Sequence, residues 1–492
     1  MPTRLVLLPF SSRLHRALVW ISLAVLLVWT LSGFLHPLMG LLAPQPAQRS
    51  APPLSVSAPD LHAGLPGVLA KAGESAVLRL VPGPGGALWQ ATMPSGERRY
   101  LRLDGRAWSG DDAAYVRWLA GWYLGEERTI ASMRRLDAFT PDYPWVNRLL
   151  PVWEVRFAGQ AGLTAYLHTE TASLASLGDD RRRLLQQGFR ALHTLDWLDG
   201  ERPIARFVLV MAMVALLLTA ASGFLLWALR RPAARPTPAR RWHRRLALIA
   251  GLPLLLMSGS GLVHALWSAG DGAERGLRLP PPRFDVARLS ALAAMPLPAW
   301  PEVPERLGSA SLAASPEGAP WLILRPPLAG GWGAPVPEAL VIDLESGQPL
   351  ANGERQLAEA AARAQGLPEG GGLERVTHFS PGYDFRNRRL PAWLAALPDG
   401  QRVALDPDTA QRLDVLSSSA RVEAYVFSLA HKWQPLAGLL GSPARRDALQ
   451  VALLSLGPLL AFLGLRLRRT TRPHSALGPA ASPHITPSSP RP

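Results

Sequence analysis

Residues 15–36 read HRALVWISLAVLLVWTLSGFLH, and residues 243–264 read HRRLALIAGLPLLLMSGSGLVH. Each stretch has a histidine at both ends, and no charged side chain interrupts Ala17–Leu35 or Leu246–Trp267. A helix rises about 1.5 Å per residue, so either run can cross a bilayer core of about 30 Å. Both stretches are therefore predicted to be membrane-spanning helices with a histidine near each membrane surface.

Two further uncharged stretches, Phe207–Leu229 and Ala448–Leu465, also have the length of a span. The second is short and contains Gly457-Pro458, which predicts a kink, and we still assign it as spanning. Ala17–Leu35 could instead be a cleaved signal peptide. However, its apolar run exceeds the usual signal-peptide core and no clean A-x-A site follows it. We therefore expect an uncleaved anchor and four spans.

The net charge of +15, from 52 Lys+Arg and 37 Asp+Glu, is concentrated on one side of these spans. Residues 41–203 contain 18 basic and 17 acidic side chains, and residues 269–446 contain 18 and 19, so both large loops are nearly neutral. Of the other 16 basic residues, 15 lie in the termini and in the loop 230–245. By the positive-inside rule, the termini and this loop are cytoplasmic and the large loops are outside. The excess positive charge is thus explained by membrane topology and does not indicate nucleic-acid binding.

The predicted fold class is a membrane protein with an α-helical four-span bundle and two α+β outer domains. Alternating apolar runs such as Ala76–Leu80 and Trp321–Leu324 predict strands, whereas Asp111–Gly125 and Glu354–Gln365 predict helices. The predicted order is a cytoplasmic N-terminus (1–16), a span (17–40), an outer domain (41–203), a span (204–229), a basic cytoplasmic loop (230–245), a span (246–268), a second outer domain (269–446), a span (447–467) and a disordered cytoplasmic tail (468–492).

The same unit of helix, outer domain and helix is predicted to occur twice. The two quoted stretches are offset by 228 residues, and each ends in a Ser-Gly-x-x-His string. An outer string, Phe-x-Pro-x-Tyr…Asn-Arg-x-Leu-Pro-x-Trp, occurs at 139–153 and again at 379–393, offset by 240. His193 recurs as His431, offset by 238. Chance does not supply a colinear set of this size, so the chain is interpreted as a tandem repeat.

Six of the eleven histidines form three duplicated pairs near the ends of the spans: His15 with His243, His36 with His264, and His193 with His431. Ionisable side chains at membrane depth are functional candidates by default. The chain has no cysteine, which excludes iron–sulfur clusters, thiolate-held zinc and thioether-attached haem. The metal chemistry that remains is b-type haem held by two imidazoles.

Small residues accompany the outer histidines. Gly33 lies three residues before His36, and Gly261 three before His264, so each shares a helix face with its histidine. A bare backbone there would let a flat macrocycle approach the imidazole. We expect His36, His193, His264 and His431 to ligate haem iron near the outer surface, and His15 and His243 to hold a further haem near the cytoplasm. Pairing within a repeat and pairing across the repeats both fit.

Simpler interpretations exist for each feature. A juxtamembrane histidine beside arginines is often an interfacial residue, and Gly and Ser are common where membrane helices pack. The outer aromatic string could line a cleft for an anionic or aromatic ligand, or could form a turn whose aromatics fill a small core. Asp406–Thr409 predicts a turn between strands. The five histidines without a repeat partner are expected to be ordinary surface residues: His62, His168, His378, His474 and His484.

The chain resembles the PepSY-associated transmembrane family over about residues 10–470. The resemblance rests on the basic-flanked His15 and His243, the Ser-Gly-x-x-His strings, Leu192-His193 before a span, and the turn at Asp406–Thr409. It implies a bacterial inner-membrane protein of iron uptake with PepSY-like periplasmic domains, such as a ferric-siderophore reductase. In that case electrons from an unidentified donor on the cytoplasmic or membrane side would pass through haem to a periplasmic ferric chelate.

Two other classes of function remain open. One is a haem-free PepSY membrane protein that binds or restrains an envelope partner such as a peptidase. The other is a carrier for a siderophore or an ion, which should have polar or broken spans near the midplane. The spans here are apolar apart from Ser and Thr. A carrier is therefore the least favoured of the three functions.

Overall fold

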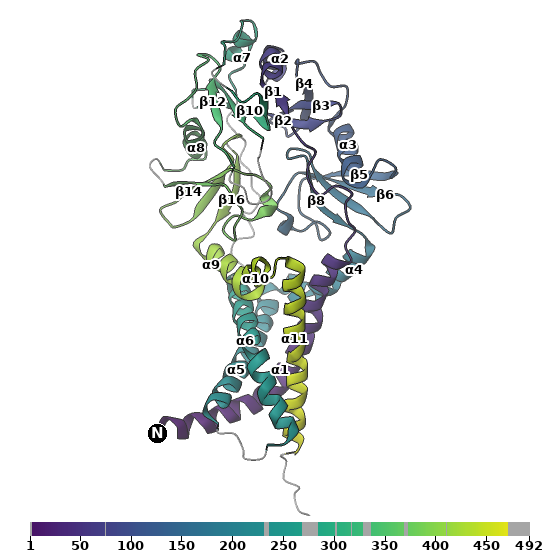
Figure 1. Ribbon diagram of the computed structural model, residues 1–492, viewed down its shortest axis with the longest axis vertical. Helices are drawn as coiled ribbons and strands as arrows, with labels where there is room; N and C mark the ends of the chain where they lie inside the picture. The colour runs from purple at the N-terminus through teal and green to yellow at the C-terminus, as the bar shows by residue number, and fades with distance from the viewer. Residues whose placement is uncertain are drawn as a thin grey trace, which may run out of the picture. The chain divides into compact units, whose positions relative to one another are not determined.

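The computed structural model describes residues 2–73, 75–230, 236–267, 284–300, 303–315, 317–327, 336–368, 372–409 and 411–470 (Figure 1). Parts of the predicted basic loop (231–235) and of the predicted tail (471–492) lie outside these residues. The chain forms two compact units. The helical unit consists of Met1–Leu31, Met211–Gly259 and Ala444–Pro492, and the sheet unit consists of Ser32–Val210 and Ser260–Pro443.

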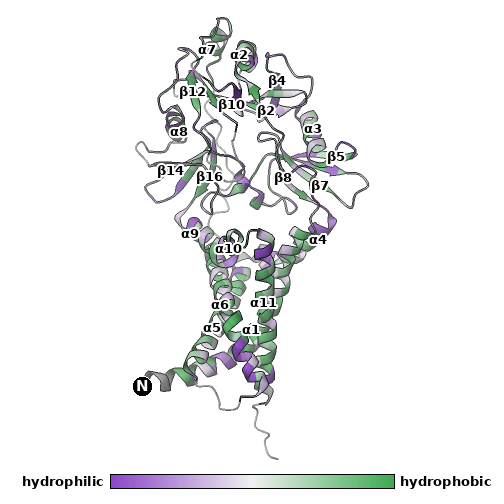
Figure 2. Cartoon of the chain, in the orientation of Figure 1, coloured by the Kyte–Doolittle hydropathy of each residue, from purple (hydrophilic) through white to green (hydrophobic). Residues whose placement is uncertain are grey.

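Four long helices contain the apolar stretches: α1 (Pro2–Leu41), α5 (Arg202–Leu229), α6 (Pro238–Trp267) and α11 (Pro443–Thr470). Each is long and apolar enough to cross a membrane. Hydrophobic residues cover most of their length (Figure 2). The four predicted spans are therefore confirmed as helices of the required length and composition. The last helix continues through Pro458.

Small side chains bring the helices together within the helical unit. Ser22 Oγ lies 2.6 Å from Thr219 Oγ1. Gly457 packs so closely on Leu26 that an added Cβ would lie 3.3 Å from its Cδ1. Such contacts are typical of membrane helices, because lipid tails are as apolar as the side chains and close packing must hold the helices together.

The sheet unit contains a six-stranded antiparallel sheet built from both outer stretches. The first stretch supplies β2 (Val77–Gly83), β3 (Gly86–Thr92) and β4 (Arg98–Arg102), and the second supplies β10 (Ser309–Ala314), β11 (Pro320–Arg325) and β12 (Leu340–Asp343). The order is β12-β11-β10-β2-β3-β4, and the join pairs Leu78 with Leu312 and Arg79 with Ser311.

A common hydrophobic core lies beside this sheet. It includes Leu78 and Trp89 from the first stretch and Leu312 and Leu322 from the second. Two helices contribute to it, α2 (Ala58–Ala72) and α7 (Val286–Ala293), and β1 (Val56–Ser57) pairs with β9 (Arg306–Leu307). The sequence pattern did not predict this shared sheet. Its physical reason is that pairing β2 with β10 covers an edge that each three-stranded half would otherwise expose.

Each outer stretch also has its own four-stranded antiparallel sheet. The first is β5 (Ile130–Leu136), β6 (Val152–Phe157), β7 (Thr164–His168) and β8 (Ser173–Gly178), and the second is β13 (Leu373–Val376), β14 (Ala392–Ala396), β15 (Arg402–Leu405) and β16 (Arg412–Leu416). The helices α3 (Asp112–Leu124) and α8 (Gly353–Ala364) pack on them and confirm the two predicted helical patches.

Short helices connect these sheets to the long helices α5 and α11. After β8 come α4 (Asp180–Phe189), a π-helical turn η2 (Arg190–Thr194) and η3 (Asp196–Glu201). After β16 come α9 (Ser418–Val426), a π-helical turn η5 (Phe427–His431) and α10 (Gln434–Leu439). Single π-turns inside helices are frequent at functional sites. Here they contain His193 and His431.

Candidate cofactor site

His193 is held by the end of the first predicted span. Its Nδ1 lies 3.0 Å from the hydroxyl of Ser32, which is fully buried in α1. A Cβ added to Gly33 would lie 3.8 Å from His193 Cε1, in ordinary van der Waals contact, so Gly33 lies next to the ring. Phe189 stacks on the same imidazole with ring centroids 4.6 Å apart. The ring orientation of His193 is thus fixed from two sides.

The second half repeats this arrangement around His431. Its Nδ1 lies 3.1 Å from Ser260 Oγ, and its ring stacks on Phe427 with centroids 4.6 Å apart. His264 stacks on Phe427 as well, at 4.8 Å, and its Nδ1 lies 2.5 Å from the carboxylate of Glu423. In the first half the ring of His36 lies 5.9 Å from that of Phe189.

The serine of each Ser-Gly-x-x-His string therefore contacts a different histidine from the one expected. The spacing placed Ser32 and Gly33 on the face of His36, but their contacts are with His193, 161 residues away. Ser260 likewise contacts His431 rather than His264. The cause is that the helix face bearing these small residues is covered by the π-turn that precedes the next span.

Burial lowers the pKa of His193 to about 4, and the positive charges that His36 and His264 can carry add to the effect. His193 is therefore neutral at physiological pH and keeps a nitrogen lone pair. Nδ1 faces the Ser32 hydroxyl, and when Nδ1 donates to that oxygen the lone pair is on Nε2. A neutral imidazole with an occupied Nδ1 is the form that ligates metals in proteins.

The helical unit contains the third histidine pair. His15 donates from Nδ1 to the carbonyl of Thr219 at 3.1 Å and lies 3.1 Å from Ser222 Oγ. His243 donates from Nδ1 to the carbonyl of Leu460 at 3.2 Å. A carbonyl can only accept, so both rings carry their proton on Nδ1 and leave the Nε2 lone pair available.

Glycines lie beside both of these rings. A Cβ on Gly223 would approach His15 Cε1 to 3.3 Å, and one on Gly464 would approach His243 Cε1 to 3.1 Å. Sequence reasoning missed both glycines. The signal was present, because Gly223 and Gly464 are 241 residues apart, as are the two carbonyl residues, Thr219 and Leu460.

The predicted turn at Asp406–Thr409 lies between β15 and β16, and its carboxylates enter a buried ionic cluster. Asp406 lies 3.0 Å from Arg79 in β2 and 3.7 Å from Arg389. Glu170 pairs with Arg98 at 3.4 Å and also with Arg389. Burial raises the pKa of Asp406, but the guanidinium groups of Arg79 and Arg389 outweigh it and hold that pKa below its ordinary value.

His168 lies in this cluster, and the expectation of a surface residue was wrong for it. Its side chain is fully buried, with Nδ1 2.7 Å from Thr171 Oγ1 and Nε2 3.8 Å from Glu170. Burial follows from its place at the end of β7, next to the ionic cluster. His62 is partly buried and contacts the carbonyl of Pro298 at 3.0 Å. His474 and His484 lie outside the described residues.

Each outer aromatic string forms a turn with a buried tyrosine side chain. Tyr143 is buried, stacks on Phe139 and donates to the carbonyl of Leu149 at 2.9 Å. Tyr383 is buried in the same way, stacks on Phe379 and donates to the carbonyl of Arg389 at 3.1 Å. Among the two interpretations of these strings, the contacts match the turn with a small aromatic core.

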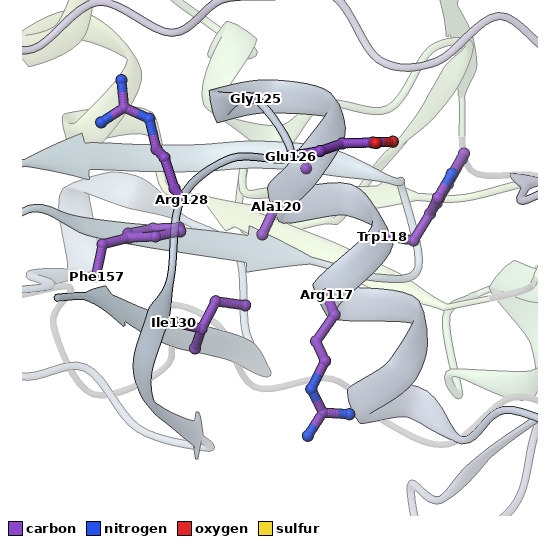
Figure 3. A pocket seen from close by; sticks show the side chains of 9 residues that line it. Arg117, Trp118, Ala120, Gly125, Glu126, Arg128, Ile130 and Phe157 are labelled. Carbon is purple, nitrogen blue, oxygen red and sulfur yellow. The ribbon is translucent and has the colours of Figure 1, made fainter.

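A separate hollow of about 340 Å³ lies between α3 and the strands β5 and β6 (Figure 3). Its walls include Trp118, Ile130 and Phe157, and charged residues of both signs, such as Arg117 and Glu126, lie around it. The aromatic strings do not line it. Because its charges are mixed, it does not define the charge of a ligand.

The described residues contain no group of three or more His, Cys, Asp or Glu side chains that could hold a bare metal ion. The histidines are arranged in the smaller sets given above.

Residues 126–314 match the model of the family described as the PepSY-associated TM region. This is the family that the sequence resembles, and the matched segment contains His193, His243 and His264. The match covers less than half of the chain. No curated protein and no solved structure matches the chain.

Proposed function

We propose that this protein is a haem-containing reductase of the bacterial inner membrane that passes electrons across the membrane to a periplasmic ferric chelate, such as a ferric siderophore, during iron uptake. The observation that carries the proposal is the fixed Nδ1 of five histidines. His193 and His431 face a serine hydroxyl, His15 and His243 face a backbone carbonyl, and His264 faces a carboxylate. All five of these contacts use Nδ1, and none of them uses Nε2.

The donor set fits a b-type haem. Haem iron takes two axial ligands from the protein, so it does not need the cluster of three or more side chains that a bare ion requires. The chain has no cysteine for covalent attachment. Glycine lies beside the rings of His15 and His243, where a larger side chain would press on the imidazole. His36, His193, His264 and His431 would hold haem in the sheet unit, and His15 and His243 would hold it in the helical unit.

A bound haem would supply one-electron transfer between ferric and ferrous iron. The residues of this chain would do the remaining work. The carbonyl partners set the tautomer of His15 and His243. The serines orient His193 and His431, and Phe189 and Phe427 fix the planes of these two rings by stacking. Reduction of the substrate iron would weaken its bond to hard oxygen ligands and so release it from the chelate.

The charge distribution supports a cytoplasmic location for both termini and a periplasmic location for the sheet unit. Of the 16 basic residues outside the two large loops, 15 lie at one end of the spans, as the positive-inside rule requires. His15 and His243 then lie near the cytoplasm, and the other four histidines lie near the periplasm. This order supports an electron path outward from a donor on the cytoplasmic or membrane side.

We also propose that the chain arose by duplication of a helix–domain–helix unit. The contacts of His193 with Ser32 and Phe189 recur for His431 with Ser260 and Phe427. The carbonyl partners of His15 and His243 recur in the same way. Matched contacts at matched offsets support a common origin for the two halves.

A reduced-minus-oxidised absorbance spectrum of the purified full-length protein tests the cofactor. The expected result is the sharp α-band of low-spin b-type haem. A colourless preparation from cells well supplied with haem would reject the proposal and favour a haem-free membrane protein that binds an envelope partner. If the band is present, mixing the reduced protein with a ferric chelate should reoxidise it, and failure to do so would reject ferric chelates as the substrate.

A further inference from the structure

Apolar side chains are exposed on one face of the short helices that adjoin the spans. In α9 and η5 the exposed residues Val422, Tyr425 and Leu429 follow the spacing i, i+3, i+7, which places them on one stripe of a helix. Polar side chains flank this stripe, since Arg421 donates to the carbonyl of Gly400 at 2.9 Å and Glu423 lies 2.5 Å from His264 Nδ1. This segment is therefore amphipathic.

The first half also has exposed apolar side chains on the equivalent short helices, at a different spacing. Leu184 in α4 is 69% exposed, and it lies 238 residues before Val422, the offset that also relates His193 to His431. Leu192 is exposed next to His193, and Trp197 in η3 is 69% exposed. In α10 of the second half, Leu439 is 81% exposed. Large apolar side chains are thus exposed on the short helices of both halves.

The position of these short helices in the chain indicates what covers their exposed apolar side chains. Helix η3 ends at Glu201, and the membrane-spanning α5 begins at the next residue, Arg202. Helix α10 ends at Leu439, and α11 begins at Pro443. Both amphipathic segments thus lie within a few residues of a span, at the depth where a bilayer changes from hydrocarbon to headgroups. Tryptophan, tyrosine and leucine on amphipathic helices are the residues that enter this layer.

We propose that α4–η2–η3 and α9–η5–α10 are interfacial helices whose apolar faces are embedded in the lipid bilayer. The partner of this surface is phospholipid, at the boundary of the acyl chains and the headgroups. The membrane contact of the protein then extends beyond the four spans and includes the elements that carry His193 and His431. This inference does not depend on a bound haem.

Site-directed spin labelling tests the proposal, and the absence of cysteine makes the native chain a clean background. Single cysteines would replace Leu184, Val422 and Leu439, and the labelled full-length protein would be placed in phosphatidylcholine nanodiscs. Two controls are Met295, which is an exposed apolar residue after α7, and Asp137, which is an exposed acid. Collision rates of each label with oxygen and with a water-soluble nickel complex would then be measured by EPR.

The expected result is an oxygen-to-nickel ratio several-fold higher at the three test sites than at Met295 and Asp137, because oxygen concentrates in lipid and nickel stays in water. A nickel rate as high as that of the controls would overturn the proposal, because the face would be in water. Low rates for both reagents would also overturn it, because a protein or a cofactor, and not lipid, would cover the face.

Discussion

The hydroxyl of Ser32 lies 3.0 Å from Nδ1 of His193, a residue 161 positions later in the chain. The end of one predicted span thereby fixes the histidine that precedes the next span, and Ser260 does the same for His431. Partners of this kind orient a ligating imidazole and set its tautomer, and their loss typically costs 10–100-fold in metal affinity.

Replacing Ser32 or Ser260 by alanine should therefore weaken haem retention by about 10-fold or more, because the imidazole loses its fixed orientation. Haem content per protein would be measured by pyridine haemochromogen after dialysis against apomyoglobin. Ser455→Ala is the matched control, since the Ser455 hydroxyl is exposed and bonds only within its own helix, to the carbonyl of Val451 at 2.7 Å. Equal haem loss in all three variants would contradict the role of the two serines.

Gly464→Leu should remove haem from the site of His15 and His243. A Cβ at this position would already lie 3.1 Å from His243 Cε1, so a leucine would displace the ring. The amplitude of the reduced-minus-oxidised band should fall, and the part held by the other four histidines should remain. Gly40→Leu is the control, because a Cβ at Gly40 would meet no atom within 4 Å. An unchanged spectrum of Gly464→Leu would exclude His243 as a ligand.

If His264 ligates haem as proposed, Glu423→Gln should raise the reduction potential of that haem. The carboxylate lies 2.5 Å from His264 Nδ1 and makes the imidazole more electron-rich, which favours ferric iron. In the first half the equivalent position, 238 residues earlier, is Leu185. The two halves should therefore differ in potential.

Potentiometric titration of the full-length protein would measure this shift, and about 60 mV would correspond to a tenfold change in relative affinity for the two oxidation states. Glu374→Gln changes an exposed acid paired with Arg402 and should leave the potentials unchanged. If Glu423→Gln also leaves them unchanged, the carboxylate does not act on a ligand.

Asp406→Asn should destabilise the sheet unit by about 3–5 kcal/mol, because it leaves the buried Arg79 and Arg389 short of a charge partner. The pKa of Asp406 is lower in the folded protein than in the unfolded chain. Its stabilisation is therefore present above the ordinary carboxyl pKa of about 3.9 and is lost as the pH falls through the lower, folded value.

Thermal unfolding followed by tryptophan fluorescence, over a range of acid pH, would check this prediction. Asp399→Asn is the control, because that side chain is exposed and caps only the backbone N–H of Gln401 at 2.9 Å. A wild-type protein whose stability does not fall toward low pH, or an Asp406→Asn variant as stable as the control, would contradict it.

The sequence predicted the features that depend on local patterns. The uncharged runs located the four spans because charge is excluded from a bilayer core at any position along a helix. The helices at 112–124 and 353–364 were predicted within one residue at each end. The duplicated histidines were found because equal spacing in two copies is visible without a structure.

The features that sequence reasoning missed depend on distant contacts. Helical spacing placed Gly33 and Ser32 beside His36, but which face of α1 meets η2 depends on the path of 161 residues between Ser32 and His193. His168 was expected at the surface, and its burial follows from Glu170 and the arginines gathered from both halves. Pairing of β2 with β10 joins residues more than 200 positions apart, and no periodicity encodes it.

The pairing of β2 with β10 also constrains how such a chain can be divided. A polypeptide that stopped after α5 would keep β2, β3 and β4 but would expose the backbone of β2 along a hydrophobic strand. Such a polypeptide would have to dimerise, with β2 of one copy paired to β2 of the other, to cover this edge. Covalent linkage of the two stretches removes that dependence on concentration.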